Sequence, residues 1–330
     1  IKSIISINFF ILLKKFFNKN LNVVFFYFPV KIYQDNILEL IDELKKEKNV
    51  KIVLGYNRGS SSEIKKYKDA FFLNIGYLKF IKNINIFLSS YLVYDFPDSL
   101  NKVYLHHDIY DGPWVNPEKE KFLIKTLNKS SHIFLSSDIS ISALQKKINQ
   151  YSAIDRRERK LKLINTGYLK LDHVHQKLKD NVFKEDSILL APTLTSSLID
   201  YNLDNYLNLI IQELLNDSKF KLIYRPHPGD VKDSKKNLII KSICEKYKDN
   251  KNFTLDVNIS YLDSYKKSKI LITDFSGTAY TYAFSKLRPV IFFSKNENKL
   301  TRSDLNDLFY FNDRNNIGTI VQNVEKLKDE

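Results

Sequence analysis

Cysteine and methionine are almost absent from this chain of 330 residues. The one cysteine, Cys244, excludes an internal disulfide framework and leaves zinc coordination by paired cysteines out of reach. A lone thiol fits a reducing compartment, so we expect a cytoplasmic protein. No methionine occurs, not even at position 1, and we therefore expect a fragment or a processed form.

Long apolar runs are lacking too. The run at residues 4–13 is too short for a transmembrane helix, which needs roughly 20 residues, and no signal-peptide cleavage site follows it. Three interpretations remain: a buried helix of the first domain, an interfacial amphipathic helix with Lys14, Lys15 and Lys19 on its polar side, or the tail of a truncated hydrophobic segment. We favour the buried helix.

Acidic residues are outnumbered by basic ones, and the formal net charge is +14. Such a charge fits anionic partners: nucleic acid, the inner leaflet of a membrane, or a phosphorylated substrate. The lysine excess also fits a simple compositional bias. Because the lysines are dispersed and no RNA-binding signature or zinc finger is present, we expect no nucleic-acid partner.

Short apolar runs alternate with amphipathic segments along the whole chain. Residues 23–28 are apolar, residues 34–48 have helical spacing, and the pattern restarts after a polar stretch at residues 175–186. This predicts an α/β protein with two doubly wound, Rossmann-like domains, residues 1–178 and 179–330, facing a central cleft. That is the glycosyltransferase-B architecture, in which ligands bind beyond the carboxyl ends of the strands.

The strand predicted at residues 270–273 runs into a polar turn and then a helix. The turn contains Asp274, Ser276, Gly277 and Thr278. Unpaired N–H groups and the positive end of the dipole make such a helix N-terminus a site for phosphate. The alternative is that Asp274 and Ser276 only cap the helix.

A second candidate loop is Arg225-Pro226-His227-Pro228, directly after a predicted strand. The two prolines restrict the backbone around His227, so the imidazole is held in place, and the Arg225 guanidinium suits phosphate oxygens. A lone loop histidine is more often structural. Its setting here favours function.

His106, His107, Asp108 and Asp111 follow a predicted strand of the first domain. A histidine is the natural general base near neutral pH, and a neighbouring carboxylate would orient it. The alternative is a metal site. Adjacent histidines in extended chain point to opposite faces, which argues against it, and we predict neither a metal nor a cofactor.

These segments resemble the CDP-glycerol glycerophosphotransferase family, the teichoic-acid and capsule polymerases. The resemblance follows the family's order: Val103-Tyr-Leu-His-His107, Thr166-Gly-Tyr-Leu-Lys-Leu-Asp172, Leu189-Leu-Ala-Pro-Thr193, Tyr224-Arg-Pro-His-Pro228 and Ile272-Thr-Asp-Phe-Ser-Gly277. The departures are His106-His107-Asp108 for the family's Trp-His-Gly, Leu-Lys for Pro-Arg after the Gly-Tyr pair, and Gly277 for a second serine.

The resemblance implies transfer of glycerol phosphate from CDP-glycerol to a hydroxyl of an anionic glycan or polyol-phosphate acceptor, with release of CMP. It implies catalysis by His107, with Asp108, and by His227 with Arg225 on the phosphoryl oxygens. The expected substrate- or nucleotide-binding residues are His106, Gly167, Thr193, Arg225, Pro226, Asp274, Ser276, Gly277 and Thr278. Two alternatives remain: a glycosyltransferase of the same fold using a nucleotide sugar, and a non-catalytic polyanion-binding protein.

Overall fold

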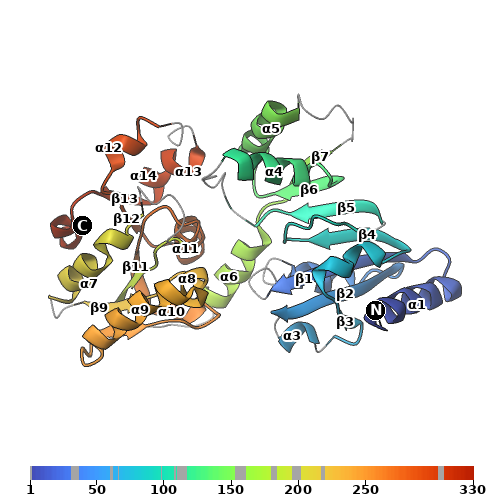
Figure 1. Ribbon diagram of the computed structural model, residues 1–330, viewed down its shortest axis with the longest axis horizontal. Coiled ribbons are helices and arrows are strands. Elements are labelled where there is room, and N and C mark those ends of the chain that lie inside the picture. The colour runs from blue at the N-terminus through green and yellow to red at the C-terminus, as the bar shows by residue number, and fades with distance from the viewer. Residues whose placement is uncertain are drawn as a thin grey trace. The chain divides into compact units, whose positions relative to one another are not determined.

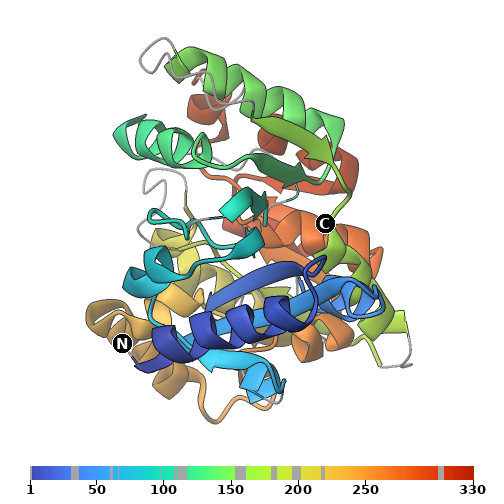
Figure 2. The ribbon, with the colours of Figure 1, turned by 90° about the vertical axis from the view of Figure 1, so that its right-hand side faces the viewer.

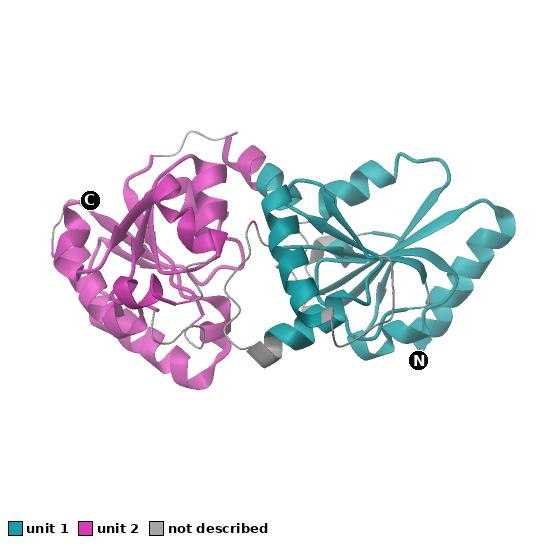
Figure 3. Cartoon of the chain, turned by 90° about the horizontal axis from the view of Figure 1, so that it is seen from above, with its two compact units in different colours: residues 1–108, 116–173 teal, residues 109–115, 174–330 magenta. Residues whose placement is uncertain are grey.

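The computed structural model describes residues 2–30, 37–59, 62–65, 67–97, 99–107, 109, 117–152, 161–179, 184–194, 202–216, 220–303 and 308–330. The chain forms two compact units (Figure 3). Unit 1 comprises residues 1–108 and 116–173, and unit 2 comprises residues 109–115 and 174–330. The chain passes from one unit to the other inside a helix, between His173 and Val174.

Unit 1 is a seven-stranded parallel sheet in the order β3-β2-β1-β4-β5-β6-β7 (Figure 1). Its strands are β1 (Asn22–Val30), β2 (Val50–Gly59), β3 (Ala70–Phe72), β4 (Ile84–Ser89), β5 (Ser99–Leu105), β6 (His132–Leu135) and β7 (Lys162–Asn165). Its helices are α1 (Lys2–Phe17), α2 (Leu38–Leu44), α3 (Ser62–Lys65), η2 (Ile75–Phe80), α4 (Pro117–Leu127), α5 (Asp138–Ser152) and α6 (Leu169–Lys179), whose second half belongs to unit 2.

Both faces of this sheet are buried, which explains why β1 is apolar at successive positions. Phe25 and Tyr27 pack with Ile7 of α1, while Phe26 packs on the other face with Ile41 of α2. Successive side chains of a strand point to opposite faces, so a strand covered on both sides has no polar alternation. Figure 2 shows α1 lying across one face of the sheet.

Unit 2 is a six-stranded parallel sheet in the order β10-β9-β8-β11-β12-β13. Its strands are β8 (Ser187–Leu190), β9 (Lys221–Tyr224), β10 (Phe253–Leu255), β11 (Ser268–Thr273), β12 (Val290–Phe293) and β13 (Gly318–Val321). Its helices are η3 (Asp204–Tyr206), α7 (Leu207–Leu215), α8 (Pro228–Lys232), α9 (Ser234–Tyr247), α10 (Leu262–Lys267), α11 (Thr278–Lys286), α12 (Glu297–Leu300), α13 (Phe309–Asn312), α14 (Arg314–Ile317) and η5 (Val324–Lys328).

The prediction of two doubly wound α/β units is therefore confirmed. In unit 2 the winding direction reverses between β8 and β11, and such a reversal is where open parallel sheets bind ligands. The polar stretch expected to separate the domains is partly helical, because α6 continues to Lys179. Among the described residues no helix has the length and apolar character needed to cross a bilayer.

Candidate functional site

Four loops of unit 2 begin at the carboxyl ends of neighbouring parallel strands, and so at one edge of its sheet. They start at Ala191 after β8, Arg225 after β9, Asp256 after β10 and Asp274 after β11. Three of these four loops contain residues that the sequence singled out. The contacts between the loops decide which side chains remain available to a ligand.

The Asp274 carboxylate links three chain segments by hydrogen bonds. Its Oδ1 accepts the N–H groups of Thr193 (3.0 Å) and Phe275 (2.8 Å), and its Oδ2 accepts the N–H of Leu203 (3.2 Å). The side chain is 3% exposed, and burial raises the pKa of Asp274 to about 6, although the three backbone hydrogen bonds oppose this shift.

The alternative interpretation, in which Asp274 caps α11, does not hold for this residue. Gly277, which has no side chain, occupies the N-cap position of α11, and the first-turn N–H of Thr278 is accepted by Ser276 and not by Asp274. The Asp274 carboxylate instead joins the loop after β8, through Thr193, to the turn after β11. These two strands flank the winding reversal, so Asp274 fixes the position of the loop after β8 relative to the turn after β11.

Two buried tyrosines hold the turn after β11 through their hydroxyl groups. Tyr310 donates its hydroxyl hydrogen to the carbonyl of Ser276 (2.9 Å), and the Tyr265 hydroxyl lies 2.7 Å from Thr278 Oγ1. The Ser276 hydroxyl oxygen accepts the Thr278 N–H at 3.4 Å. Gly277 is exposed, whereas Ser276 and Thr278 are half-buried. The Gly277 backbone and the Ser276 hydroxyl are therefore the groups of this turn best placed for a ligand.

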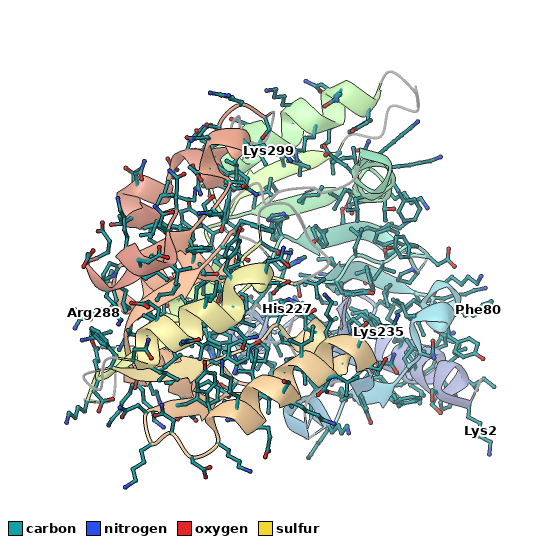
Figure 4. All side chains as sticks on the ribbon, turned by 60° about the vertical axis from the view of Figure 1, so that its left-hand side comes forward. Lys2, Phe80, His227, Lys235, Arg288 and Lys299 are labelled. Atoms are coloured by element: carbon teal, nitrogen blue, oxygen red, sulfur yellow. The ribbon has the colours of Figure 1, made fainter. Side chains whose placement is uncertain are left out.

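His227 is held in one orientation by the helix that follows it. Its Nδ1 accepts the N–H of Gly229 (3.0 Å) at the start of α8. His227 is labelled in Figure 4. A Cβ on Gly229 would lie 3.0 Å from His227 Nδ1, so a glycine is what permits this approach. Pro226, immediately before, is buried and Pro228 is the first residue of α8.

This contact sets the charge and tautomer of His227. Because Nδ1 accepts a hydrogen bond, the ring proton sits on Nε2, and Nε2 makes no hydrogen bond to any described residue. Burial lowers the pKa of His227, with nearby Asp230 opposing the shift. The ring is thus a neutral hydrogen-bond donor at neutral pH.

Arg225 is bound within unit 2. Its guanidinium donates to Asp256 Oδ2 (2.6 Å) and to the carbonyls of Asn258 (2.8 Å) and Ile259 (3.4 Å). Asp256 is 6% exposed and also accepts hydrogen bonds from Ser264 Oγ and from the Asn258 N–H (2.9 Å). Burial opposes ionisation of Asp256, yet these bonds and Arg225 hold its pKa below the ordinary value. Arg225 therefore fixes the loop after β10.

In unit 1 two predicted segments meet at His107. The Tyr168 hydroxyl donates to the His107 carbonyl (2.5 Å), and His107 Nδ1 lies 3.0 Å from the Tyr104 hydroxyl. Gly167 has φ of +73°, a left-handed conformation that side chains disfavour, and it precedes Tyr168 directly. Gly167 thus forms the turn that presents Tyr168 to His107.

His106 is tied to the neighbouring strand by its backbone and lies beside His107. The His106 N–H donates to the Phe134 carbonyl (2.9 Å), extending the β5–β6 pairing, and its ring lies 5.9 Å from that of His107 between centroids. Asp108 and Asp111 lie outside the described residues. Within the described part of the chain, no group of three His, Cys, Asp or Glu side chains is arranged to hold a metal ion.

Sequence reasoning missed Tyr104, Tyr168, Asp256 and Tyr265. Tyr168 and Tyr104 lie within the family-like motifs, so their positions were visible but not their partners. Asp256 follows an apolar strand directly, as Asp274 does, and that shared pattern was the available signal. Tyr265 lies on a short helix, where nothing local marks its contact with Thr278.

Comparison with known proteins supports this description. Residues 208–311 match the family model of the LIC12162 family transferase. No curated protein sequence matches the chain. The structure is similar to UDP-GlcNAc 2-epimerase from Methanocaldococcus jannaschii, at 17% identity and a TM-score of 0.58, covering 93% of this chain and 91% of that one. It is equally similar to the wall teichoic acid polymerase TagF, at 17% identity and a TM-score of 0.58, covering 94% and 80%.

The fold is of the glycosyltransferase-B type. The resemblance to the glycerophosphotransferases, first seen in short motifs, is thus confirmed at the level of the fold. The epimerase has been determined in complex with UDP-GlcNAc and UDP, and TagF after soaking with CDPG. Proteins of this fold therefore include ones that bind nucleotide-linked compounds.

Proposed function

We propose that this protein transfers glycerol phosphate, or a related polyol phosphate, from CDP-glycerol to a hydroxyl of a cell-surface polymer or its lipid-linked precursor. The observation that carries the proposal is the fixed His227 ring, which offers an Nε2–H donor at the end of β9. A neutral donor can bind a phosphoryl oxygen in the ground state and strengthen as negative charge develops. The transferase family match over residues 208–311 supports the same unit as the donor-binding part.

Unit 2 would hold the donor with three groups besides His227. The Gly277 backbone and the Ser276 hydroxyl would contact the diphosphate at the positive end of α11. Thr193 is half-buried, and its backbone is already positioned by Asp274, so its hydroxyl is the third group. Arg225 would act indirectly, because its guanidinium is bound to Asp256 and two carbonyls.

Unit 1 would hold the acceptor and remove its proton. If His107 Nδ1–H donates to the Tyr104 hydroxyl oxygen, the Nε2 lone pair can accept the proton of the attacking hydroxyl. The acceptor oxygen then bonds to the phosphorus of the glycerol phosphate. The bond from that phosphorus to the bridging oxygen of the diphosphate breaks, and CMP leaves with both electrons. Asp108 retains its proposed role of orienting His107.

A second candidate is a reaction on a nucleotide sugar. The observation in its favour is the UDP-GlcNAc 2-epimerase, whose identity and TM-score equal those of TagF. The same His227 donor and the same turn after β11 would suit a sugar nucleotide, because the diphosphate is common to both ligand classes. The nucleobase and the transferred group separate the two candidates.

Calorimetric titration of the purified protein with CDP-glycerol, CMP, UDP, UDP-GlcNAc and CMP-sialic acid tests the proposal. We expect CDP-glycerol and CMP to bind most tightly. Preference for the uridine compounds would favour the second candidate, and binding of none would contradict both. With CDP-glycerol and an acceptor, His107→Ala and His227→Ala should each reduce turnover by about a hundredfold or more while the protein stays folded.

A further inference from the structure

Helix α1 is apolar on two opposite sides, and unit 1 buries only one of them. Ile7 and Ile11 are fully buried in the core beneath the helix. Ile4 and Phe10 are partly buried against the same core, whereas six further apolar side chains are exposed, and Phe16 and Phe17 reach 79% and 81%. These exposed side chains are Ile5, Phe9, Leu12, Leu13, Phe16 and Phe17. The expectation of a buried helix is thus correct for one side of α1.

The exposed side continues onto η2. The Asn8 side chain donates to the Phe80 carbonyl (2.9 Å) and accepts the Lys82 N–H (3.0 Å), which holds the end of η2 against α1. Tyr77 and Phe80 of η2 are themselves exposed. Figure 4 shows Lys2 and Phe80 at the same side of unit 1. We call the exposed apolar side chains of α1 and η2, with their lysines, the α1 face.

The α1 face is entirely basic in its own two segments. Residues 1–34 and 70–94 contain no aspartate or glutamate. Residues 1–34 contain Lys2, Lys14, Lys15, Lys19 and Lys31, and residues 70–94 contain Lys79 and Lys82. Asp95, which directly follows the second segment, pairs with Lys79 at 3.6 Å. The surface therefore combines exposed aromatic rings with positive charge, which suits a partner that is both apolar and anionic.

We propose that the α1 face binds the surface of an anionic lipid bilayer, with α1 lying parallel to the membrane. Phenylalanine and leucine side chains would enter the boundary between headgroups and acyl chains, and the lysines would contact anionic headgroups. Lysine stems reach across apolar surface while the charged end stays in water. A second copy of the chain fits less well, since a two-fold interface there would bring like charges together. This proposal is independent of the proposed reaction.

Flotation with lipid vesicles tests it. We expect the protein to bind vesicles of phosphatidylcholine with about 30% phosphatidylglycerol and to bind pure phosphatidylcholine at least about tenfold more weakly. The double variant Phe16→Ser, Phe17→Ser should lower binding to the anionic vesicles by about tenfold, because two exposed rings are lost. Lys14→Gln with Lys19→Gln should lower it by about tenfold or more, with a weaker dependence on salt.

A matched control is Leu100→Ser with Leu238→Ser, which removes side chains that are 78% and 65% exposed elsewhere. Binding of this control to vesicles should equal that of the wild type. Circular dichroism and the melting temperature should be unchanged in every variant, because each substituted side chain is outside the core. The proposal is overturned by equal binding to neutral vesicles, by full binding of the Phe16, Phe17 variant, or by an equal loss in the control. A concentration-dependent dimer that this variant abolishes, without vesicle binding, would assign the face to a second copy instead.

Discussion

The Tyr168 hydroxyl donates its hydrogen to the main-chain carbonyl of His107 at 2.5 Å, across 61 positions of sequence. Both residues belong to unit 1, so this contact is built within a single folded sheet. It acts on the backbone that carries the imidazole and not on the imidazole itself. Tyr168 is therefore a positioning residue for His107, with Gly167 supplying the turn that brings it there.

Tyr168→Phe should slow turnover by about tenfold, because His107 loses the hydrogen bond that fixes its carbonyl. Affinity for CDP-glycerol should stay unchanged, since the donor groups belong to unit 2. Steady-state kinetics together with calorimetry would separate the two effects. Tyr94→Phe, on an exposed ring of the same unit, is the control and should alter neither quantity.

Gly229→Ala should weaken CDP-glycerol binding by about fivefold to tenfold. The added Cβ would lie 3.0 Å from His227 Nδ1 and 2.6 Å from Leu194 Cδ1, so the ring must shift and its hydrogen bond weaken. Gly76→Ala provides the control, because a Cβ there approaches only Asn74 Oδ1, at 3.8 Å. Undiminished affinity in Gly229→Ala would remove His227 from the donor site.

The affinity for CDP-glycerol should be nearly constant between about pH 6.5 and pH 8. Burial lowers the pKa of His227 below its ordinary value, so the neutral form of the ring predominates throughout this range. A histidine that bound phosphate as a cation would lose affinity as the pH rose through its ordinary value of about 6.5. Titrations at several pH values across the range would decide between the two, with His227→Gln showing how much of any slope comes from this ring.

Arg225→Lys and Asp256→Asn should reduce donor affinity to a similar extent. Each variant breaks the same buried pair. In each, the loop after β10 loses the contacts that hold it at Asn258 and Ile259. Each should also lower the free energy of unfolding by about 1 to 3 kcal/mol, because a buried hydrogen-bonded charge loses its partner. If Arg225 touched the phosphate directly, Arg225→Lys would reduce affinity far more than Asp256→Asn does.

Asp274 should make stability depend on pH in the sense opposite to that of Asp256. Its pKa is about 6 in the folded protein, against an ordinary value of 3.8 for an aspartate in the unfolded chain. Between these values the folded state holds a proton that the unfolded chain has lost, so the contribution to stability falls as pH rises from about 4 to 6 and is level above. Relative to Asp274→Asn, wild type should gain about 1 kcal/mol when urea unfolding is measured at pH 5 instead of pH 7. A gain in the reverse direction would contradict this assignment.

The architecture followed from the sequence because parallel strands buried on both faces are continuous apolar runs. The stretches at residues 187–190 and 270–273 coincide with β8 and the end of β11 for that reason. The loops after them were also visible, since turn residues such as Gly277 and Pro228 end apolar runs. The length of α2 was predicted less well. Helical spacing over residues 34–48 predicts a longer helix than the described α2, which spans Leu38–Leu44.

The roles of individual polar side chains could not be read from the sequence. Whether Arg225 binds a phosphate or a carboxylate depends on Asp256, which lies 31 positions away. Whether Asp274 caps a helix or joins separate loops depends on the N–H of Leu203, 71 positions away. Such pairings arise from the order of strands in the sheet, and one sequence does not encode that order locally. His227 is the opposite case, because its partner Gly229 is two residues away.

The position of Asp274 bears on how donor specificity could be engineered in this scaffold. One carboxylate accepts hydrogen bonds from three segments. They are the loop after β8 through Thr193, the residue before η3 through Leu203, and the turn after β11 through Phe275. A replacement loop taken from a relative would arrive without the spacing that these three N–H groups require. Grafts that exchange residues 190–203 and 271–278 as one unit should fold, whereas exchanging either segment alone should leave N–H groups buried without an acceptor.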